Sequence, residues 1–130
     1  MINLSFFSYI IGIHTPYSAP EDIYTEFKPK RKGKSKELKE LLTNINNKEW
    51  KDYLLKAFGE QTTAEEVIAM YDSAIRYVDQ EIGRLIDFLK DKRIYDNTIF
   101  VITSDHGESL TEHGIFLITM VCMMCPYMFL

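Results

Sequence analysis

Cysteine is scarce in this chain, which has only Cys122 and Cys125. Two cysteines cannot build the disulfide framework of a small secreted domain, so the sequence does not indicate a redox compartment. Their C-x-x-C spacing lacks the surrounding βαβ pattern of a thioredoxin-type site and the second ligand pair of a zinc knuckle. We interpret the two thiols as soft apolar side chains.

An excess of positive charge is also lacking, because the formal net charge is −4 at pH 7. Proteins that neutralise the phosphates of nucleic acids need a basic surface, so we expect no nucleic-acid partner. The basic residues cluster in residues 28–36, a stretch with Pro and Gly that predicts a charged loop. Such a loop could attract an anionic substrate, although a plain solvated loop is the commoner case.

Residues 115–130 carry no charge at all. The segment is shorter than the roughly 20 residues that cross a bilayer as a helix, and Pro126 interrupts it. We interpret it as a divergent apolar tail, with a membrane anchor as the alternative. No positively charged stretch precedes the apolar run that follows Met1, so we expect no signal peptide. The sequence indicates neither a cellular compartment nor an oligomeric state.

What the chain does have is the composition of a globular domain, with 46% hydrophobic and 26% charged residues. Residues 63–92 carry apolar side chains at three- and four-residue steps, which predicts an amphipathic helix that begins at a capping box of Thr63 and Glu66. Continuous apolar runs at residues 4–13 and 98–103 predict buried strands. These elements predict an α/β fold with a mostly parallel sheet flanked by helices.

Two shorter helices are expected between the basic loop and the long helix. They cover residues 35–44 and 48–58, where polar and apolar side chains alternate with helical spacing. Gly59 follows the second of them and is typical of a helix C-terminus. This region therefore predicts helices that cover the sheet.

Both predicted strands end on side chains suited to metal or anion chemistry. The run at 98–103 stops at Asp105 and His106, within the motif S-D-H-G-E, and the first run stops at His14. Because open α/β sheets bind ligands at the carboxyl ends of their strands, parallel neighbours would bring these three groups together. Each group also has a plain structural alternative: His14 could bond a loop carbonyl, and Asp105 could cap the following turn.

Three sequence blocks together resemble the sulfatase family of the alkaline phosphatase superfamily. They are residues 6–20 with the motif H-T-P-Y, residues 71–89, and residues 97–114 with the motifs S-D-H-G-E and E-H-G. Their order and spacing resemble the latter half of the family's catalytic domain. The resemblance implies that residues 1–114 are a partial sulfatase catalytic domain with an incomplete fold of the alkaline phosphatase type.

The resemblance also implies roles for individual residues. Asp105 and His106 resemble the pair that closes a divalent-metal site, usually calcium in sulfatases, although an imidazole ligand leaves Mn²⁺ or Zn²⁺ open. His14 resembles the histidine that contacts the sulfate group and stabilises charge as the ester bond breaks. His113 also keeps the family's pattern, and contact with substrate is its candidate role.

The family's nucleophile, however, is missing from this sequence. It is a formylglycine made from Cys or Ser in a C/S-x-P-S-R motif, and no Cys or Ser here is followed by x-Pro-x-Arg. The family's early Asp pair is missing as well, and apolar residues replace the lysine that usually follows the E-H-G block. We therefore expect a fragment of a metal-dependent sulfatase that binds a sulfate ester and is inactive alone.

Two alternative functions stay open. The first is transfer of a phosphoryl or phosphoethanolamine group, or hydrolysis of a phosphate ester, with a Thr or Ser nucleophile and Mn²⁺ or Zn²⁺. The second is an inactive remnant without catalytic function. The missing nucleophile segment is what would distinguish the sulfatase from the transferase.

Overall fold

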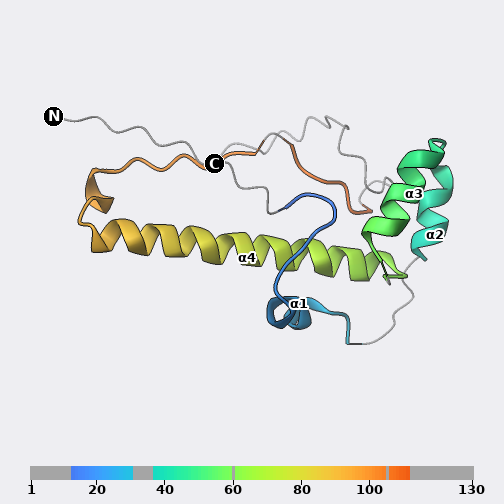
Figure 1. The fold of residues 1–130 in the computed structure, drawn as a ribbon, viewed down its shortest axis with the longest axis horizontal. Coiled ribbons are helices and arrows are strands. Elements are labelled where there is room, and N and C mark those ends of the chain that lie inside the picture. Colours follow the sequence, from blue (N-terminus) through green and yellow to red (C-terminus); the bar gives the residue numbers. More distant parts are fainter. Residues whose placement is uncertain (1–12, 31–36, 60, 105, 112–130) are drawn as a thin grey trace.

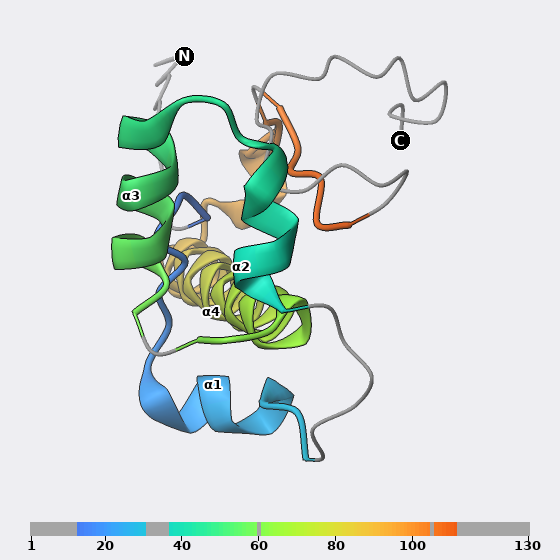
Figure 2. The same ribbon diagram turned by 90° about the vertical axis from the view of Figure 1, so that its right-hand side faces the viewer.

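One long helix organises the molecule. The structure is a computed structural model that describes residues 13–30, 37–59, 61–104 and 106–111. In these ranges the helical elements are α1 (Glu21–Phe27), α2 (Leu38–Leu41), the 3₁₀ turn η1 (Leu42–Asn44), α3 (Lys48–Ala57), α4 (Ala64–Asp91) and the 3₁₀ turn η2 (Tyr95–Asn97). Helices α2 and α3 lie side by side near the N-terminal end of α4, and α1 crosses its N-terminal half (Figures 1 and 2).

Helix α4 confirms the amphipathic helix predicted for residues 63–92. It begins at a complete capping box: the Thr63 hydroxyl accepts a hydrogen bond from the Glu66 backbone N–H at 3.3 Å, and the Glu66 carboxylate accepts one from the Thr63 N–H at 3.0 Å. It ends at Asp91 with Lys92 as its C-cap, after which Arg93 takes a left-handed conformation with φ of 57°. Local signals at both ends therefore define this element.

We expect acid to weaken the N-terminus of α4. Partial burial opposes the charged carboxylate, but hydrogen bonds from Thr62 and Thr63 outweigh it and lower the pKa of Glu66. A lowered folded-state pKa gives stability that is present above the unfolded-state value and is lost as the pH falls through the folded-state value. Urea unfolding of Glu66→Gln should therefore lose less stability than the unsubstituted chain between about pH 5 and about pH 3.

The matched control for this prediction is Glu65→Gln, which removes a neighbouring first-turn carboxylate but leaves the capping box in place. Its stability should fall with acid as steeply as that of the unsubstituted chain. Equal pH slopes for the Glu66 and Glu65 variants would contradict a special role for the capping carboxylate.

The hydrophobic core gathers around the N-terminal half of α4. Tyr17 lies at its centre, with its ring edge-on to Tyr71 at 5.1 Å between centroids and tilted against Phe58 at 6.2 Å. The buried members of this cluster are Tyr17, Leu38, Leu42, Leu54, Phe58, Ala64, Val67, Ala74 and Leu110. Farther along α4, Leu85 and Phe88 are exposed. One end of the long helix therefore carries the packed core.

The predicted sheet is not observed among the described residues. No strand is described among them, and one isolated antiparallel bridge joins Glu37 to Thr63. Residues 98–103, predicted as a buried strand, lie outside any strand, and Ile99 and Val101 are 92% and 84% exposed. This prediction was wrong for the structure, because an apolar run becomes a buried strand only when neighbours pair with it and cover it.

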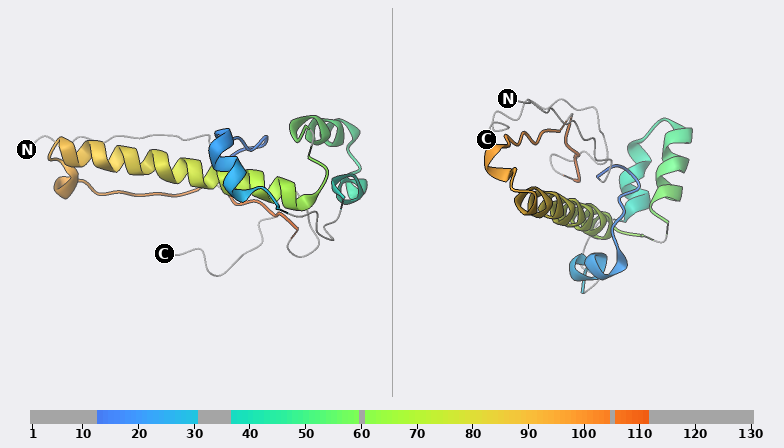
Figure 3. Two further views of the ribbon diagram at one scale, coloured as in Figure 1. Left: turned by 90° about the horizontal axis from the view of Figure 1, so that it is seen from below. Right: turned by 60° about the vertical axis from the view of Figure 1, so that its left-hand side comes forward.

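The segment after η2 instead runs back alongside α4 as an extended chain (Figures 1 and 3). Its predicted neighbour, the strand at residues 4–13, lies outside the described residues except for Ile13. The mostly parallel sheet of the expected α/β fold stays a prediction.

The two shorter helices that we predicted are observed in the structure. Helix α3 confirms the helix predicted for residues 48–58, and Gly59 ends it with a φ of 58°. The helix predicted for residues 35–44 is observed as α2 and η1. Helix α1 was not predicted. No helix among the described ranges is long and apolar enough to span a membrane.

Two other predicted segments lie wholly or partly outside the described residues. Of the basic loop at residues 28–36, only residues 28–30 are described, and they form no helix or strand. The apolar tail at residues 115–130, with both cysteines, lies outside the described residues.

Candidate functional site

The H-T-P-Y turn carries an exposed histidine whose ring orientation is fixed by the backbone. His14 Nδ1 lies 2.8 Å from the Thr15 carbonyl oxygen. Because a carbonyl oxygen can only accept, Nδ1 is the donor in this hydrogen bond. Nε2 is the second ring nitrogen and takes no part in it. The Tyr53 hydroxyl of α3 donates to the same oxygen at 3.0 Å. One carbonyl thus joins the histidine to a helix of the core. The loop-carbonyl bond that we named as the structural alternative for His14 is therefore present.

Three residues after His14, Tyr17 anchors this turn in the core. Its side chain is only 2% exposed, and its buried hydroxyl makes no hydrogen bond of standard geometry with the described residues. Burial raises the pKa of the Tyr17 hydroxyl far above its usual range, and the nearby Glu108 carboxylate raises it further. The carboxylate of the S-D-H-G-E motif therefore lies against the tyrosine of the H-T-P-Y motif.

Glu108 is the residue at which the two motifs meet. Partial burial raises its pKa, while His106, the Tyr17 hydroxyl and His14 each act to lower it. Among these groups the Tyr17 hydroxyl acts as a hydrogen-bonding neighbour, whereas the two histidines act through their charge. We call His14, Tyr17, His106 and Glu108 the two-turn cluster.

The S-D-H-G-E turn carries a second histidine, His106. Its side chain is exposed, and its Nδ1 lies 3.0 Å from the Gly107 carbonyl oxygen. A carbonyl acceptor on Nδ1 fixes the tautomer and leaves Nε2 as the nitrogen that would act as ligand, as in many metal-binding histidines.

The rest of the predicted metal site is not seen in the described part of the chain. Asp105 and His113, the other residues with predicted metal or substrate contacts, lie outside the described residues. Within the described ranges there is no group of three or more His, Cys, Asp or Glu side chains that could hold a metal ion. The roles predicted for His14, Asp105, His106 and His113 stay predictions.

Glu108 and Tyr17 are the members of the two-turn cluster to which sequence reasoning assigned no role. Both belong to the motifs that carried the family resemblance, since Glu108 ends S-D-H-G-E and Tyr17 ends H-T-P-Y. No local sequence pattern predicts that Tyr17 and Glu108 lie close together. Only the packing of the turns against α4 shows it.

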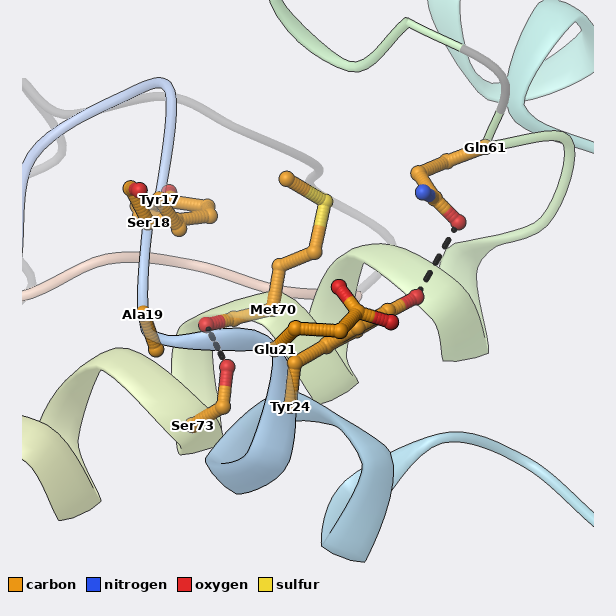
Figure 4. Close-up of a pocket in the computed structure, with 8 residues that line it drawn as sticks. All are labelled: Tyr17, Ser18, Ala19, Glu21, Tyr24, Gln61, Met70 and Ser73. Carbon is orange, nitrogen blue, oxygen red and sulfur yellow. Dashed lines mark hydrogen bonds between the residues drawn. The ribbon is translucent and has the colours of Figure 1, made fainter.

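A hollow of about 210 Å³ lies between α1 and the N-terminal half of α4 (Figure 4). The Tyr24 hydroxyl donates to Gln61 Oε1 at 3.2 Å, and the Ser73 hydroxyl donates to the Met70 carbonyl oxygen at 2.8 Å. Its lining residues are Tyr17, Ser18, Ala19, Glu21, Tyr24, Gln61, Met70 and Ser73. Because these polar groups already bond one another, we assign no ligand to this hollow.

Comparison with known proteins identifies the class of the chain. The family model named Sulfatase matches residues 4–119, so the chain belongs to the sulfatase family. This confirms the resemblance inferred from the H-T-P-Y and S-D-H-G-E motifs, and family membership implies an alkaline phosphatase-like fold. No solved structure gives a significant match.

The similar proteins include sulfatases and a phosphoethanolamine transferase. The chain is 38% identical over 72 residues to a protein named "Sulfatase" from Formosa agariphila, covering 55% of this chain and 11% of that one. It is 43% identical over 44 residues to human iduronate 2-sulfatase, covering 34% of this chain and 8% of that one. It is 42% identical over 55 residues to phosphoethanolamine transferase EptA of Escherichia coli, covering 42% of this chain and 10% of that one. The matches thus span about a tenth of the length of these relatives.

Proposed function

We propose that this chain supplies part of a sulfatase-type active site, which hydrolyses a sulfate ester with the help of a divalent cation. The observation that carries the proposal is that the H-T-P-Y and S-D-H-G-E turns, far apart in the sequence, meet where the Glu108 carboxylate lies beside the buried Tyr17. Family membership supports the same class of reaction.

In this proposal His14 binds the sulfate group. Its Nδ1–H stays on the Thr15 carbonyl oxygen, and in the doubly protonated form Nε2–H donates to a sulfate oxygen. Because a charged donor strengthens as negative charge grows on the ester oxygens, the contact favours the transition state over the bound ester. The Tyr53 hydroxyl holds the same carbonyl in place and so orients the imidazole.

Asp105 and His106 are the proposed metal ligands, with His113 as a further contact to substrate. Calcium is the proposed cation, with Mn²⁺ or Zn²⁺ as alternatives, and a bound cation would stabilise negative charge on the ester oxygens. His106 would ligate through Nε2. The nucleophile, formylglycine in this family, would come from a C/S-x-P-S-R segment that this sequence does not contain.

The full chain tests the proposal through binding. Isothermal titration with sulfate in the presence of Ca²⁺ or Mn²⁺ should show binding that His14→Ala weakens by about tenfold or more, the loss expected for a charged hydrogen bond. Asp105→Ala should abolish the dependence of sulfate binding on the cation. Any turnover of an aryl sulfate by the full chain should disappear in both variants.

Unchanged sulfate binding in both variants would overturn these site assignments. A chain that unfolds cooperatively but responds to neither sulfate nor cation would instead point to an inactive remnant. Tyr95→Ala is a control, because it removes an exposed side chain of η2, which follows the C-terminal end of α4, and it should leave sulfate binding unchanged.

A second candidate function is transfer or hydrolysis of a phosphate ester, including phosphoethanolamine transfer. The match to EptA, at 42% identity over 55 residues, favours it. The same titration distinguishes the two functions. Tighter binding of phosphate than of sulfate, with Mn²⁺ or Zn²⁺ more effective than Ca²⁺, would favour the phosphate-ester function.

A further inference from the structure

The carbonyl oxygen of Thr15 is bonded from two distant parts of the chain at once. His14 Nδ1 lies 2.8 Å away in the same turn, and the Tyr53 hydroxyl reaches the oxygen from α3 at 3.0 Å. A carbonyl oxygen has two lone pairs, so it can accept both donors together. The His14 bond joins adjacent residues, whereas the Tyr53 bond joins residues 38 positions apart. The direction of this carbonyl therefore depends on α3 as well as on the turn.

Three contacts restrict the Tyr53 side chain and the helix that carries it. The ring stacks on Trp50, with 5.2 Å between centroids and 19° between the ring planes. The side chain of Asn47 caps α3 and accepts a hydrogen bond from the Trp50 N–H at 2.9 Å. Leu54, the residue after Tyr53, is fully buried in the core. The position of the Tyr53 hydroxyl is therefore set by the packing of α3.

The Tyr53 hydroxyl has no donor left for a ligand. A tyrosine hydroxyl carries a single hydrogen, and in Tyr53 this hydrogen is donated to the Thr15 carbonyl oxygen. The remaining lone pairs of the hydroxyl can only accept, and a sulfate group has no hydrogen to donate to them. While this bond is present, Tyr53 can affect sulfate binding through the Thr15 carbonyl but not by direct donation.

We infer that Tyr53 is a positioning residue of the candidate site, which holds the Thr15 carbonyl oxygen so that the His14 hydrogen stays on Nδ1. The inference rests on the proposed function, because it explains how His14 is presented to the sulfate group through Nε2. Without the Tyr53 hydroxyl, the carbonyl would be free to turn toward water. The neutral imidazole would then populate both tautomers, since the bond made by one ring nitrogen decides which of the two carries the hydrogen.

The tautomer of His14 tests this inference without any ligand. Ring-nitrogen chemical shifts of the full chain, measured by NMR at a pH where the imidazoles are neutral, should show His14 with its hydrogen on Nδ1. Tyr53→Phe keeps the ring but removes the hydroxyl, so His14 should become a mixture of the two tautomers. His106 is an internal control, because its Nδ1 bonds the carbonyl oxygen of Gly107 at 3.0 Å in the other turn, and its tautomer should not change.

Titration of the full chain with sulfate, in the presence of Ca²⁺ or Mn²⁺, tests the consequence for binding. Tyr53→Phe should weaken sulfate binding by about threefold to tenfold, the range expected for the loss of one hydrogen bond. In a His14→Ala background the same substitution should have no further effect, because a positioning residue acts through the residue that it orients.

Tyr95→Phe is the matched control for both measurements. It deletes the same hydroxyl group from an exposed tyrosine of η2, and it should leave the His14 tautomer and the sulfate affinity unchanged. Thermal unfolding checks that each variant stays folded.

The outcomes separate this inference from the proposed function. An unchanged His14 tautomer in Tyr53→Phe would overturn the positioning role, and so would an equal loss of sulfate affinity with and without His14. If Tyr53→Phe changes the tautomer but sulfate binding does not depend on His14, the positioning role stands and the proposed function fails. If sulfate binding depends on His14 but Tyr53→Phe changes neither the tautomer nor the affinity, the proposed function stands and this inference fails.

Discussion

Replacing Tyr17 by alanine is expected to destabilise the chain by about 3–5 kcal/mol, the cost of deleting a large buried aromatic side chain. The ring is 2% exposed and packs edge-on against Tyr71 and tilted against Phe58. Its loss would leave a cavity among α3, α4 and the H-T-P-Y turn. Urea unfolding followed by far-UV circular dichroism measures the change in the free energy of unfolding.

The conservative variant Tyr17→Phe tests whether the ring or the hydroxyl is responsible. The hydroxyl is buried and has no hydrogen bond of standard geometry among the described residues, so removing it should cost at most about 1 kcal/mol and could stabilise the chain. A loss as large as that of Tyr17→Ala would show that contact with Glu108, rather than ring packing, stabilises this part of the fold.

The second large effect is expected for Leu54→Ala, at about 2–5 kcal/mol. Leu54 is fully buried and is the buried residue of α3, so its side chain holds this helix on the core. Loosening α3 would also move Tyr53 away from the Thr15 carbonyl oxygen. Urea unfolding gives the stability change, and Trp50 emission reports the displacement of the helix.

Leu85→Ala is the matched control, because it deletes the same atoms from a side chain of α4 that is 38% exposed. We expect a loss of about 1 kcal/mol or less for it, since a partly solvated site leaves little cavity. Similar losses in the two leucine variants would contradict the placement of the core at the N-terminal end of α4.

Helix α4 could be predicted from the sequence because its determinants are local. An apolar stripe with helical spacing and the capping box of Thr63 and Glu66 lie within the element itself. Helix α1 was missed although a local signal was present: Pro20 precedes it, and Glu21 and Asp22 occupy its first turn. With only two turns, the helix gave no apolar periodicity to detect.

The sheet could not be predicted reliably, because pairing depends on distant parts of a chain. Residues 98–103 have the β-branched, apolar composition of a buried strand, yet composition does not supply the neighbour that a strand needs. Sequence reasoning inferred burial from composition, and the observed exposure of Ile99 and Val101 shows the limit of that inference.

The candidate site shows the same division between local and distant information. Because His14 and His106 each follow an apolar run, we predicted that the two motifs approach each other at the edge of a parallel sheet, and that sheet is not observed among the described residues. That Glu108 lies beside Tyr17, and that Tyr53 reaches the carbonyl beside His14, follows from contacts between segments far apart in the sequence. No spacing within either motif contains that information.

The exposed segment after η2 also bears on how the protein behaves at high concentration. Ile99, Val101 and Ile102 project from an extended stretch without a charged residue, and all three are β-branched. Stretches of this kind pair with identical stretches of other molecules, which is how soluble proteins begin to aggregate. Where nothing covers this segment, a single lysine at residue 101 would act as a gatekeeper against such self-pairing.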